Sequence, residues 1–178
     1  MRFKYTTNSP SQTKKLGEVL AKKIIQSSAK KKHAKVFGLI GDLGGGKTTF
    51  LQGFAKGLTI KEKILSPTFV IIKKYKIPRH QSSLTRRRCG TQQNTPAPEQ
   101  SLMQGTARYG ILYHVDCYRI QKTQEILDLG FKKMISDQKN IVTIEWADRI
   151  RRIMPKDTTW IYFDFIDEKR RKIRNMVK

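Results

Sequence analysis

The chain has 178 residues, which is enough to bury one hydrophobic core and too few for two ordinary domains. Its net charge of +23 indicates an anionic partner such as nucleic acid, although the lysine runs lack the interleaved aromatic residues of a surface that stacks on bases. The apolar runs stay far below the ~18 residues of a membrane span and the first residues contain no apolar signal segment, so we expect a cytoplasmic protein without membrane association.

The first predicted helix begins close to the N-terminus. Ser9-Pro10-Ser11-Gln12 supplies an N-cap serine, a proline at the first helical position and a glutamine that can complete a capping box. Apolar side chains then recur at helical spacing, which predicts one buried face made of Leu16, Val19, Leu20 and Ile24.

The next segment combines a strand, a glycine-rich loop and a helix. Residues 35–40 predict a short buried strand, and residues 48–56 predict a helix that Gly57 ends. Between them, residues 41–48 have the sequence Gly-Asp-Leu-Gly-Gly-Gly-Lys-Thr, which matches G-x-x-x-x-G-K-[ST] at every fixed position. Such a loop surrounds phosphate oxygens with main-chain N–H groups, so we predict that the chain binds a nucleoside triphosphate.

Within this loop, Lys47 is expected to reach the β- and γ-phosphates, and the Thr48 hydroxyl is expected to bind a phosphate-bound Mg²⁺. The alternative is a glycine-rich turn that carries a lysine by chance, and the flanking strand and helix argue against it. The predicted nucleotide-binding residues are Asp42, Leu43, Gly44, Gly45, Gly46, Lys47, Thr48 and Thr49, to which we add Thr13 from the first helix.

The rest of the chain alternates between strands and a helix. Pro67 breaks any helix, and the β-branched run after it predicts a strand within residues 64–72, entered by a loop at residues 66–68. The later predicted elements are strands at 111–116, 140–146 and 158–166, and a helix at 123–135 that Gly130 weakens in its middle. This order predicts an α/β, P-loop NTPase-like three-layer fold with a mostly parallel central sheet.

Residues 79–110 do not follow this pattern. Lysine is dense elsewhere, yet it is absent between Lys76 and Lys122, and the segment is rich in Gln, Thr, Ser, Pro and Arg without any period. We therefore predict a single P-loop ATPase domain, residues 1–178, interrupted by a disordered insertion at about 79–110. Arg86-Arg87-Arg88 within it is either a phosphate lid or a solvated basic run.

Two predicted strands end in an acid, Asp116 and Glu145. Ligands of open α/β sheets bind beyond the carboxyl ends of the strands, so both carboxylates are expected to face the Mg²⁺, although either acid could merely cap a turn. The spacing does not decide which of them is the direct ligand. Trp146 offers a flat face for adenine or belongs to the core, and His114 is expected to make a structural hydrogen bond.

With these residues, the chain resembles the TsaE (YjeE) family, the ATPase component of bacterial tRNA threonylcarbamoyladenosine (t6A) synthesis. The resemblance covers nearly everything except residues 79–110. It rests on five motifs in the same order, at residues 41–49, 66–69, 114–119, 128–131 and 144–146. It implies ATP at the glycine-rich loop, Mg²⁺ near Thr48 and Glu145, a switch-like loop at Thr68, a Walker-B-type role for Asp116, and Trp146 near the nucleotide.

The resemblance also implies a function. The protein would be an accessory ATPase that acts with the TsaB and TsaD proteins in modifying adenosine 37 of tRNAs reading codons that begin with A, and it would contact tRNA indirectly or weakly. Lys47, Thr68, Asp116 and Glu145 would be its catalytic residues. We expect slow intrinsic hydrolysis, because the sequence has no evident arginine finger. Two departures from the family are the insertion and Ala147, which stands where a proline commonly follows Glu-Trp.

Two other functions fit parts of the sequence. A small-molecule or nucleotide kinase would use Arg86 to Arg88 as a lid over a phosphoryl acceptor. A basic nucleic-acid-binding protein with a vestigial P-loop would bind tRNA in a salt-sensitive way without regard to ATP. The intact Lys47-Thr48 pair argues against such decay.

Overall fold

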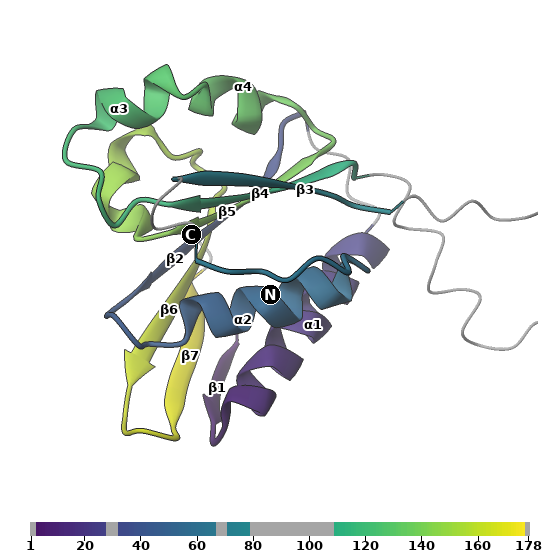
Figure 1. Cartoon of the computed structure of the whole chain (residues 1–178), viewed down its shortest axis with the longest axis vertical. Coiled ribbons are helices and arrows are strands. Elements are labelled where there is room, and N and C mark those ends of the chain that lie inside the picture. The colour runs from purple at the N-terminus through teal and green to yellow at the C-terminus, as the bar shows by residue number, and fades with distance from the viewer. Residues whose placement is uncertain (1–2, 28–31, 67–70, 79–108, 177–178) are drawn as a thin grey trace, which may run out of the picture.

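The computed structural model describes residues 3–27, 32–66, 71–78 and 109–176 of the chain. Their strands form one sheet in the order β1-β7-β6-β2-β5-β4-β3 (Figure 1). The strands are β1 (Lys4–Thr7), β2 (Lys35–Gly41), β3 (Ile72–Lys76), β4 (Ile111–Asp116), β5 (Asn140–Glu145), β6 (Thr159–Phe165) and β7 (Arg171–Met176).

The centre of the sheet is parallel, as the sequence predicts. β2 pairs in parallel with β5 and β6, and β5 pairs in parallel with β4. The outer strands are antiparallel: β3 pairs with β4, β7 with β6, and β1 with β7. The sequence patterns miss the four-residue strand β1 and the basic strand β7, because their alternation of apolar and polar residues is weak.

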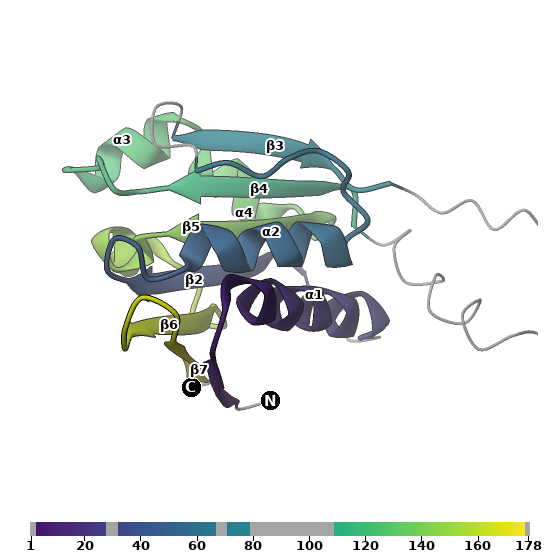
Figure 2. The ribbon, with the colours of Figure 1, turned by 60° about the horizontal axis from the view of Figure 1, so that its bottom comes forward.

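Helices cover both faces of the sheet and give three layers (Figures 1 and 2). Helices α1 (Pro10–Gln26) and α2 (Lys47–Gly57) pack with Phe37 and Leu39 of β2. On the opposite face, Val36 packs with α3 (Thr123–Asp128) and α4 (Phe131–Ser136), near the 3-10 helix η3 (Ala147–Ile153). Alternate side chains of the central strands therefore belong to two separate hydrophobic clusters.

The predicted cap of α1 is present. The Ser9 hydroxyl accepts from the Gln12 N–H at 3.2 Å, and the Gln12 side chain accepts from the Asn8 N–H at 2.7 Å. The predicted buried face is wrong in part, since Val19 is 38% exposed and Leu16 and Leu20 are only partly buried. The buried residues of α1 are Thr13, Gly17, Glu18, Ala21, Ile24 and Ile25.

The buried face of α1 differs from the predicted apolar stripe because α1 and α2 make contact through glycines. A Cβ atom added to Gly17 would lie 2.2 Å from the carbonyl oxygen of Phe50, and one added to Gly53 would lie 1.8 Å from that of Lys14. Small residues at these positions let the two backbones meet, so the closest line of contact is not the most apolar stripe. Since α2 starts at the glycine-rich loop, this contact also fixes the loop's helix against the sheet.

Three predicted boundaries need correction. The helix predicted at 123–135 is two short helices, because Gly130 adopts a left-handed conformation with φ of 82°. Of the strand predicted within 64–72, residues 64–66 are not in a strand, residues 67–70 lie outside the described residues, and β3 begins at Ile72, after Ile71 at φ of 58°. The predicted insertion ends earlier than residue 110, since Tyr109 is buried and Gly110 bonds to both Ile77 and Lys139. Residues 79–108, including Arg86 to Arg88, lie outside the described residues.

None of the helices in the described ranges combines the length and the apolar character that a bilayer crossing requires.

The helix contact predicts a strong effect of Gly53→Ala. The added Cβ would meet the Lys14 carbonyl oxygen at 1.8 Å, so the helices must separate. We expect the free energy of unfolding to fall by about 3 kcal/mol, although alanine favours the helix by about 1 kcal/mol. Gly110→Ala is the matched control, because a Cβ there meets no described atom within 4 Å, chain neighbours aside. Urea denaturation measures both variants, and equal midpoints would contradict the close contact.

Candidate functional site

The glycine-rich loop joins the carboxyl end of β2 to the first turn of α2. Gly44 has φ of 72° and Gly46 has φ of 93°, a region that side chains with a Cβ disfavour, which explains the glycines at these two positions. Gly46 is also the N-cap of α2. The loop thus lies at the positive end of a helix dipole, where an anion is stabilised.

A cavity of about 350 Å³ lies in front of this loop. Its size is within the range of small-molecule sites. Its walls are Leu43, Gly44, Gly45, Gly46, Lys47, Thr48, Thr49, Ser66, Asp116, Tyr118, Glu145 and Trp146. The structure therefore brings together the loop, both strand-end acids and the tryptophan that the sequence singled out.

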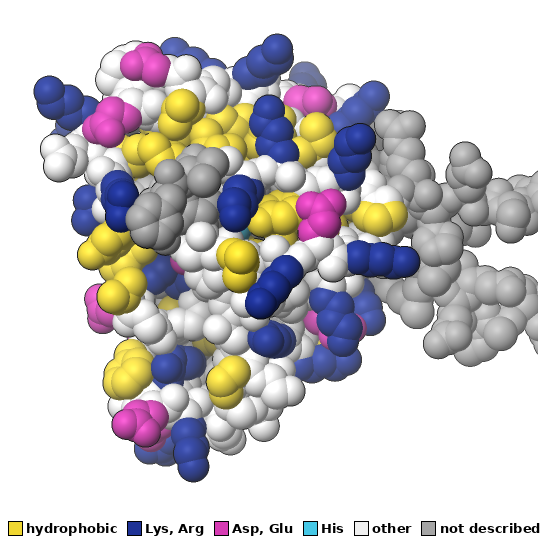
Figure 3. Space-filling model, viewed as in Figure 1, with side chains coloured by type: hydrophobic (Ala, Val, Ile, Leu, Met, Phe, Trp, Pro, Cys, Tyr) yellow, Lys and Arg dark blue, Asp and Glu magenta, His cyan; other side chains and the backbone are white. Residues whose placement is uncertain are grey.

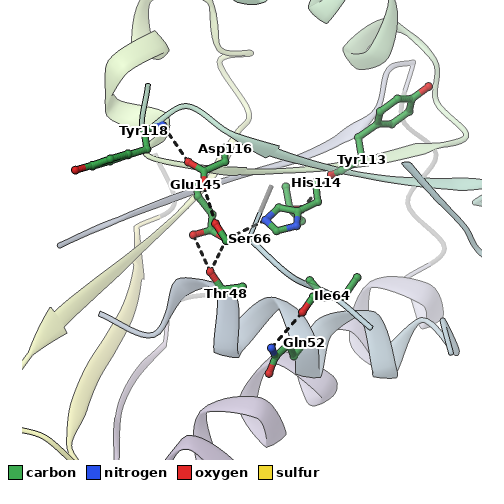
Figure 4. Close-up of polar contacts among 10 residues, drawn as sticks. Thr48, Gln52, Ile64, Ser66, Tyr113, His114, Asp116, Tyr118 and Glu145 are labelled. Atoms are coloured by element: carbon green, nitrogen blue, oxygen red, sulfur yellow. Dashed lines mark hydrogen bonds and ion pairs between the residues drawn. The ribbon is translucent and has the colours of Figure 1, made fainter. Parts of the chain in front are cut away.

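The strand-end acids are neighbours because of the sheet register. Asp116 of β4 lies directly opposite Glu145 of β5 in a parallel pair, and both are nearly fully buried. Figure 4 shows both carboxylates above the first turn of α2. The Thr48 hydroxyl donates to Glu145 at 2.9 Å, whereas Asp116 accepts from the Ser66 hydroxyl at 2.8 Å and from the Tyr118 N–H at 2.9 Å. Glu145 is thus linked to the glycine-rich loop, and Asp116 to the segment that leads into residues 67–70.

His114 supports Glu145 from behind. Its Nε2 lies 2.9 Å from the Glu145 carboxylate, and the ring is 1% exposed (Figure 4). Its Nδ1 has no hydrogen-bond partner among the described residues. These contacts fit a ring that donates its Nε2–H to Glu145, the structural hydrogen bond expected from the sequence.

Lys47 is turned back onto its own loop. Its Nζ donates to the carbonyl oxygens of Gly41 at 2.7 Å and Asp42 at 2.8 Å, and it lies 4.2 Å from the centre of the Trp146 ring. Burial lowers the pKa of Lys47, and the carboxylate of Glu145 is the strongest of several that oppose this shift. The charged amine is therefore held inside the cavity by carbonyl dipoles, a carboxylate and an aromatic face.

Trp146 directly follows β5 and has a left-handed backbone conformation, φ of 56°. This turn directs its ring to the wall of the cavity, where it is half-buried. The ring of Tyr118, which is 41% exposed, lies 5.1 Å away. Trp146 is therefore placed at the edge of the cavity and only partly in the core.

The oxygen atoms at the cavity suit a hard cation. A threonine hydroxyl and two carboxylates are ligands that Mg²⁺ prefers. Within the described part of the chain, no cluster of three His, Cys, Asp or Glu side chains is arranged to hold a metal ion alone. At nucleotide sites, phosphate oxygens and water supply several of the six ligands of Mg²⁺.

Two predicted site residues lie away from the cavity wall, and a third is not described. Thr13 is behind the loop, with its hydroxyl 2.8 Å from that of Thr7 and its methyl group 3.8 Å from a Cβ position on Gly46. Asp42 contributes its carbonyl oxygen to Lys47 and to the Gly45 N–H. Thr68 lies outside the described residues.

The sequence patterns missed one contact to the loop. Arg171 of β7 donates from Nε and Nη2 to the carbonyl oxygen of Gly44, at 3.2 and 3.1 Å. Its neighbours in the sequence, Lys169-Arg170-Arg171-Lys172, are all basic, so nothing local marks this residue. The contact depends on β7, a strand that the sequence did not predict.

Comparison with known proteins places the chain in a family. The family model described as threonylcarbamoyl adenosine biosynthesis protein TsaE matches residues 7–86 and 82–173. The chain belongs to the TsaE family. The two matched pieces meet inside the segment predicted as an insertion.

Family members of known name and structure agree with this placement. The tRNA threonylcarbamoyladenosine biosynthesis protein TsaE of Bacillus subtilis (strain 168) is 31% identical over 174 residues, which is 97% of this chain and 84% of that protein. The protein of the same name from Rickettsia conorii is 27% identical over 94% of this chain and 74% of its own length. The crystal structure of Bacillus subtilis YdiB superposes with a TM-score of 0.62 at 27% identity, covering 100% of this chain and 87% of that one.

Cys117 gives a probe of how firmly the end of β4 is held. It follows Asp116 directly, is fully buried, and burial raises its pKa to about 12. In a Cys89→Ser variant, Cys117 is the only thiol. We expect alkylation by iodoacetamide at pH 8 to be at least about 100-fold slower in the native protein than in urea, because the thiolate is scarce and enclosed. Equal rates would mean that this end of the sheet opens readily.

Proposed function

We propose that this TsaE-family chain is a Mg²⁺-dependent ATPase that assists threonylcarbamoylation of adenosine 37 in tRNAs reading codons that begin with A. One observation carries the proposal. Lys47 and Thr48 of the glycine-rich loop and the two strand-end carboxylates, Asp116 and Glu145, converge on one cavity of about 350 Å³. Each of these residue types has a role in holding a triphosphate and its metal.

The loop would bind the phosphates, and Lys47 would neutralise them. In the structure the Lys47 amine uses two loop carbonyls as partners, at 2.7 and 2.8 Å. The flexible lysine stem allows the amine to exchange these neutral partners for phosphate oxygens, which attract it more strongly. Trp146 would then present its ring to the base or the ribose at the edge of the cavity.

Thr48 and Glu145 would hold the Mg²⁺, since the Thr48 hydroxyl already lies 2.9 Å from a Glu145 oxygen. When bound, the ion would neutralise charge on the β- and γ-phosphate oxygens. His114 would keep Glu145 oriented, and Asp116 would connect the site to Ser66 and the segment after it, where Thr68 would act. We thus assign the direct contact to Glu145 and a linking role to Asp116.

Hydrolysis by the chain alone would be slow. The guanidinium of Arg171 donates to Gly44, and that of Arg149 donates to the carbonyl of Ile120 at 3.2 Å. Arg171 and Arg149 are thus engaged with carbonyl oxygens, and fast phosphoryl transfer needs a cation on the transferred group. A partner protein would complete the site. The TsaB and TsaD proteins are the partners we propose.

The basic surface supports a minor role for tRNA contact. Lys and Arg side chains are scattered over the face in Figure 3, between hydrophobic and acidic ones. Nucleic-acid sites usually gather such charge in one patch or stripe. Contact of this face with tRNA would therefore be weak, or indirect through the partners.

Lys47→Ala tests the mechanism. We expect the rate of ATP hydrolysis to fall at least about 100-fold, because a cation on the phosphates is lost. The fold should stay intact, since the hydrogen bonds that the amine makes in the described structure go to two loop carbonyls. Lys56→Ala is the control in the same helix, with a side chain 76% exposed. A Lys47→Ala protein that hydrolyses ATP at the normal rate would remove the mechanism.

Stimulation experiments separate an assembly ATPase from a kinase. We expect purified TsaB and TsaD together to raise the rate of ADP formation severalfold, and nucleoside monophosphates to leave it unchanged. A severalfold response to a monophosphate, with a phosphorylated product, would instead support the kinase. Binding of tRNA that is steeply salt-dependent and indifferent to ATP would support the nucleic-acid-binding alternative.

A further inference from the structure

Arg171 joins the outer strands of the sheet to the glycine-rich loop. It is the first residue of β7 and is paired in register with Thr7 of β1 and with Phe165 of β6. Its backbone is therefore held from both sides. From this position its guanidinium spans to the loop and donates two hydrogen bonds to one acceptor, the carbonyl oxygen of Gly44.

The peptide that receives these bonds is held at its other end as well. The N–H of Gly45, in the same peptide plane as the Gly44 carbonyl, donates to the Asp42 carbonyl oxygen at 3.0 Å. Together with Arg171, this bond fixes the orientation of the Gly44–Gly45 peptide. In a loop of glycines, which have many accessible conformations, such a restraint is costly to lose.

Packing does not supply the same restraint. A Cβ atom added to Gly44 would meet no described atom within 4 Å, chain neighbours aside, and the preceding Leu43 side chain is 76% exposed. This part of the loop thus projects from the molecule, and its position depends on hydrogen bonds. Arg171 provides the bonds that come from outside the loop.

The guanidinium is itself fixed before it reaches the loop. Its Nη1 donates to the carbonyl oxygens of Asp167 and Arg170, and its Cζ lies 4.4 Å from the centre of the Phe165 ring. The Asp167 carboxylate shapes this turn by accepting from the N–H groups of Lys169 and Arg170 and from the Arg170 side chain. The side chain of Arg171 therefore loses little further freedom when it holds Gly44.

We propose that Arg171 is a positioning residue for the triphosphate: it holds the Gly44–Gly45 peptide so that the loop has its phosphate-binding shape before the nucleotide arrives. This inference rests on the proposed function. Because Arg171 acts through the loop backbone and bonds to a carbonyl, its contribution is made in the ground state and in the transition state alike. Its loss therefore weakens nucleotide binding and raises KM, and leaves kcat nearly unchanged.

Calorimetric titration of the full chain with Mg-ATP and with Mg-ADP tests this. We expect Arg171→Ala to raise both dissociation constants about tenfold, as for the loss of one charge-assisted anchor. Arg174→Ala is the matched control, because Arg174 lies on the same strand and pairs with Asp164 at 3.4 Å, away from the loop. Arg171→Lys keeps the charge and the stem but has no planar fork, so it should fall between Arg171→Ala and the parent chain.

Amide hydrogen exchange of the nucleotide-free protein gives an independent readout. In Arg171→Ala the Gly45 N–H should exchange about tenfold faster, because the loop opens more often, while the central strands keep their protection. In Arg174→Ala it should exchange at the parent rate. A general loss of stability would raise exchange in the central strands too, and this would overturn the proposal.

The outcomes separate this inference from the proposed function. If the parent chain binds Mg-ATP and Arg171→Ala binds it equally well, Arg171 has no positioning role and the proposed function stands. An equal loss in Arg174→Ala would show a general effect of charge and would also overturn the inference. If the parent chain binds no nucleotide, the proposed function fails, and unchanged Gly45 exchange would then reject the Arg171 contact as well. If Arg171→Ala does not fold, the titration and the exchange measurement are made on Arg171→Lys alone.

Discussion

The site depends on the register of three parallel strands. β2, β5 and β4 run in the same direction, so their carboxyl ends meet at one edge of the sheet. β2 delivers the glycine-rich loop there, and the β4–β5 register places Asp116 opposite Glu145. A shift by one residue in either strand would turn its acid to the opposite face, toward the cluster that packs on α3 and α4. Strand pairing thus sets the geometry of the cavity. It also decides which side chains line the cavity.

Sequence patterns were sufficient to predict the central strands β2 and β5 and the loop between β2 and α2. Continuous apolar runs mark β2 and β5 because both faces of a central parallel strand are buried, and the glycine-lysine-threonine motif marks the loop between β2 and α2. Asp116 and Glu145 could be assigned to the site because a strand end is visible in the sequence. Which acid would contact Thr48 could not, because that choice depends on the distance between α2 and each strand. In the structure, the Thr48 hydroxyl donates its hydrogen bond to Glu145.

The parts that escaped prediction share a physical cause. The face of α1 was assigned from its apolar residues, yet Gly17 and Gly53 set the line of contact by permitting backbone approach, and glycine carries no apolar signal. β1 has only four residues and β7 holds three basic residues among its six, so their pairing with the sheet leaves little trace in their own sequence. Gly130 was visible as a weak point, but only the structure shows that φ of 82° there divides the helix in two.

Two of the features that escaped prediction, the face of α1 and the strand β7, lie beside the loop. α2 is fixed by the glycine contact with α1, Thr13 of α1 lies behind Gly46, and β7 carries the arginine that reaches Gly44. A loop that must curl around phosphates cannot be held by apolar packing on its ligand side, because that side has to stay open. Its restraint must come from behind and from outside, and these are the directions from which α1 and β7 approach. The antiparallel extension of the sheet by β7 and β1 therefore does more than pair with β6, the last strand of the parallel part. It places the guanidinium of Arg171, which is held by other contacts, beside the flexible glycine-rich loop. The parallel strands alone do not supply these hydrogen bonds.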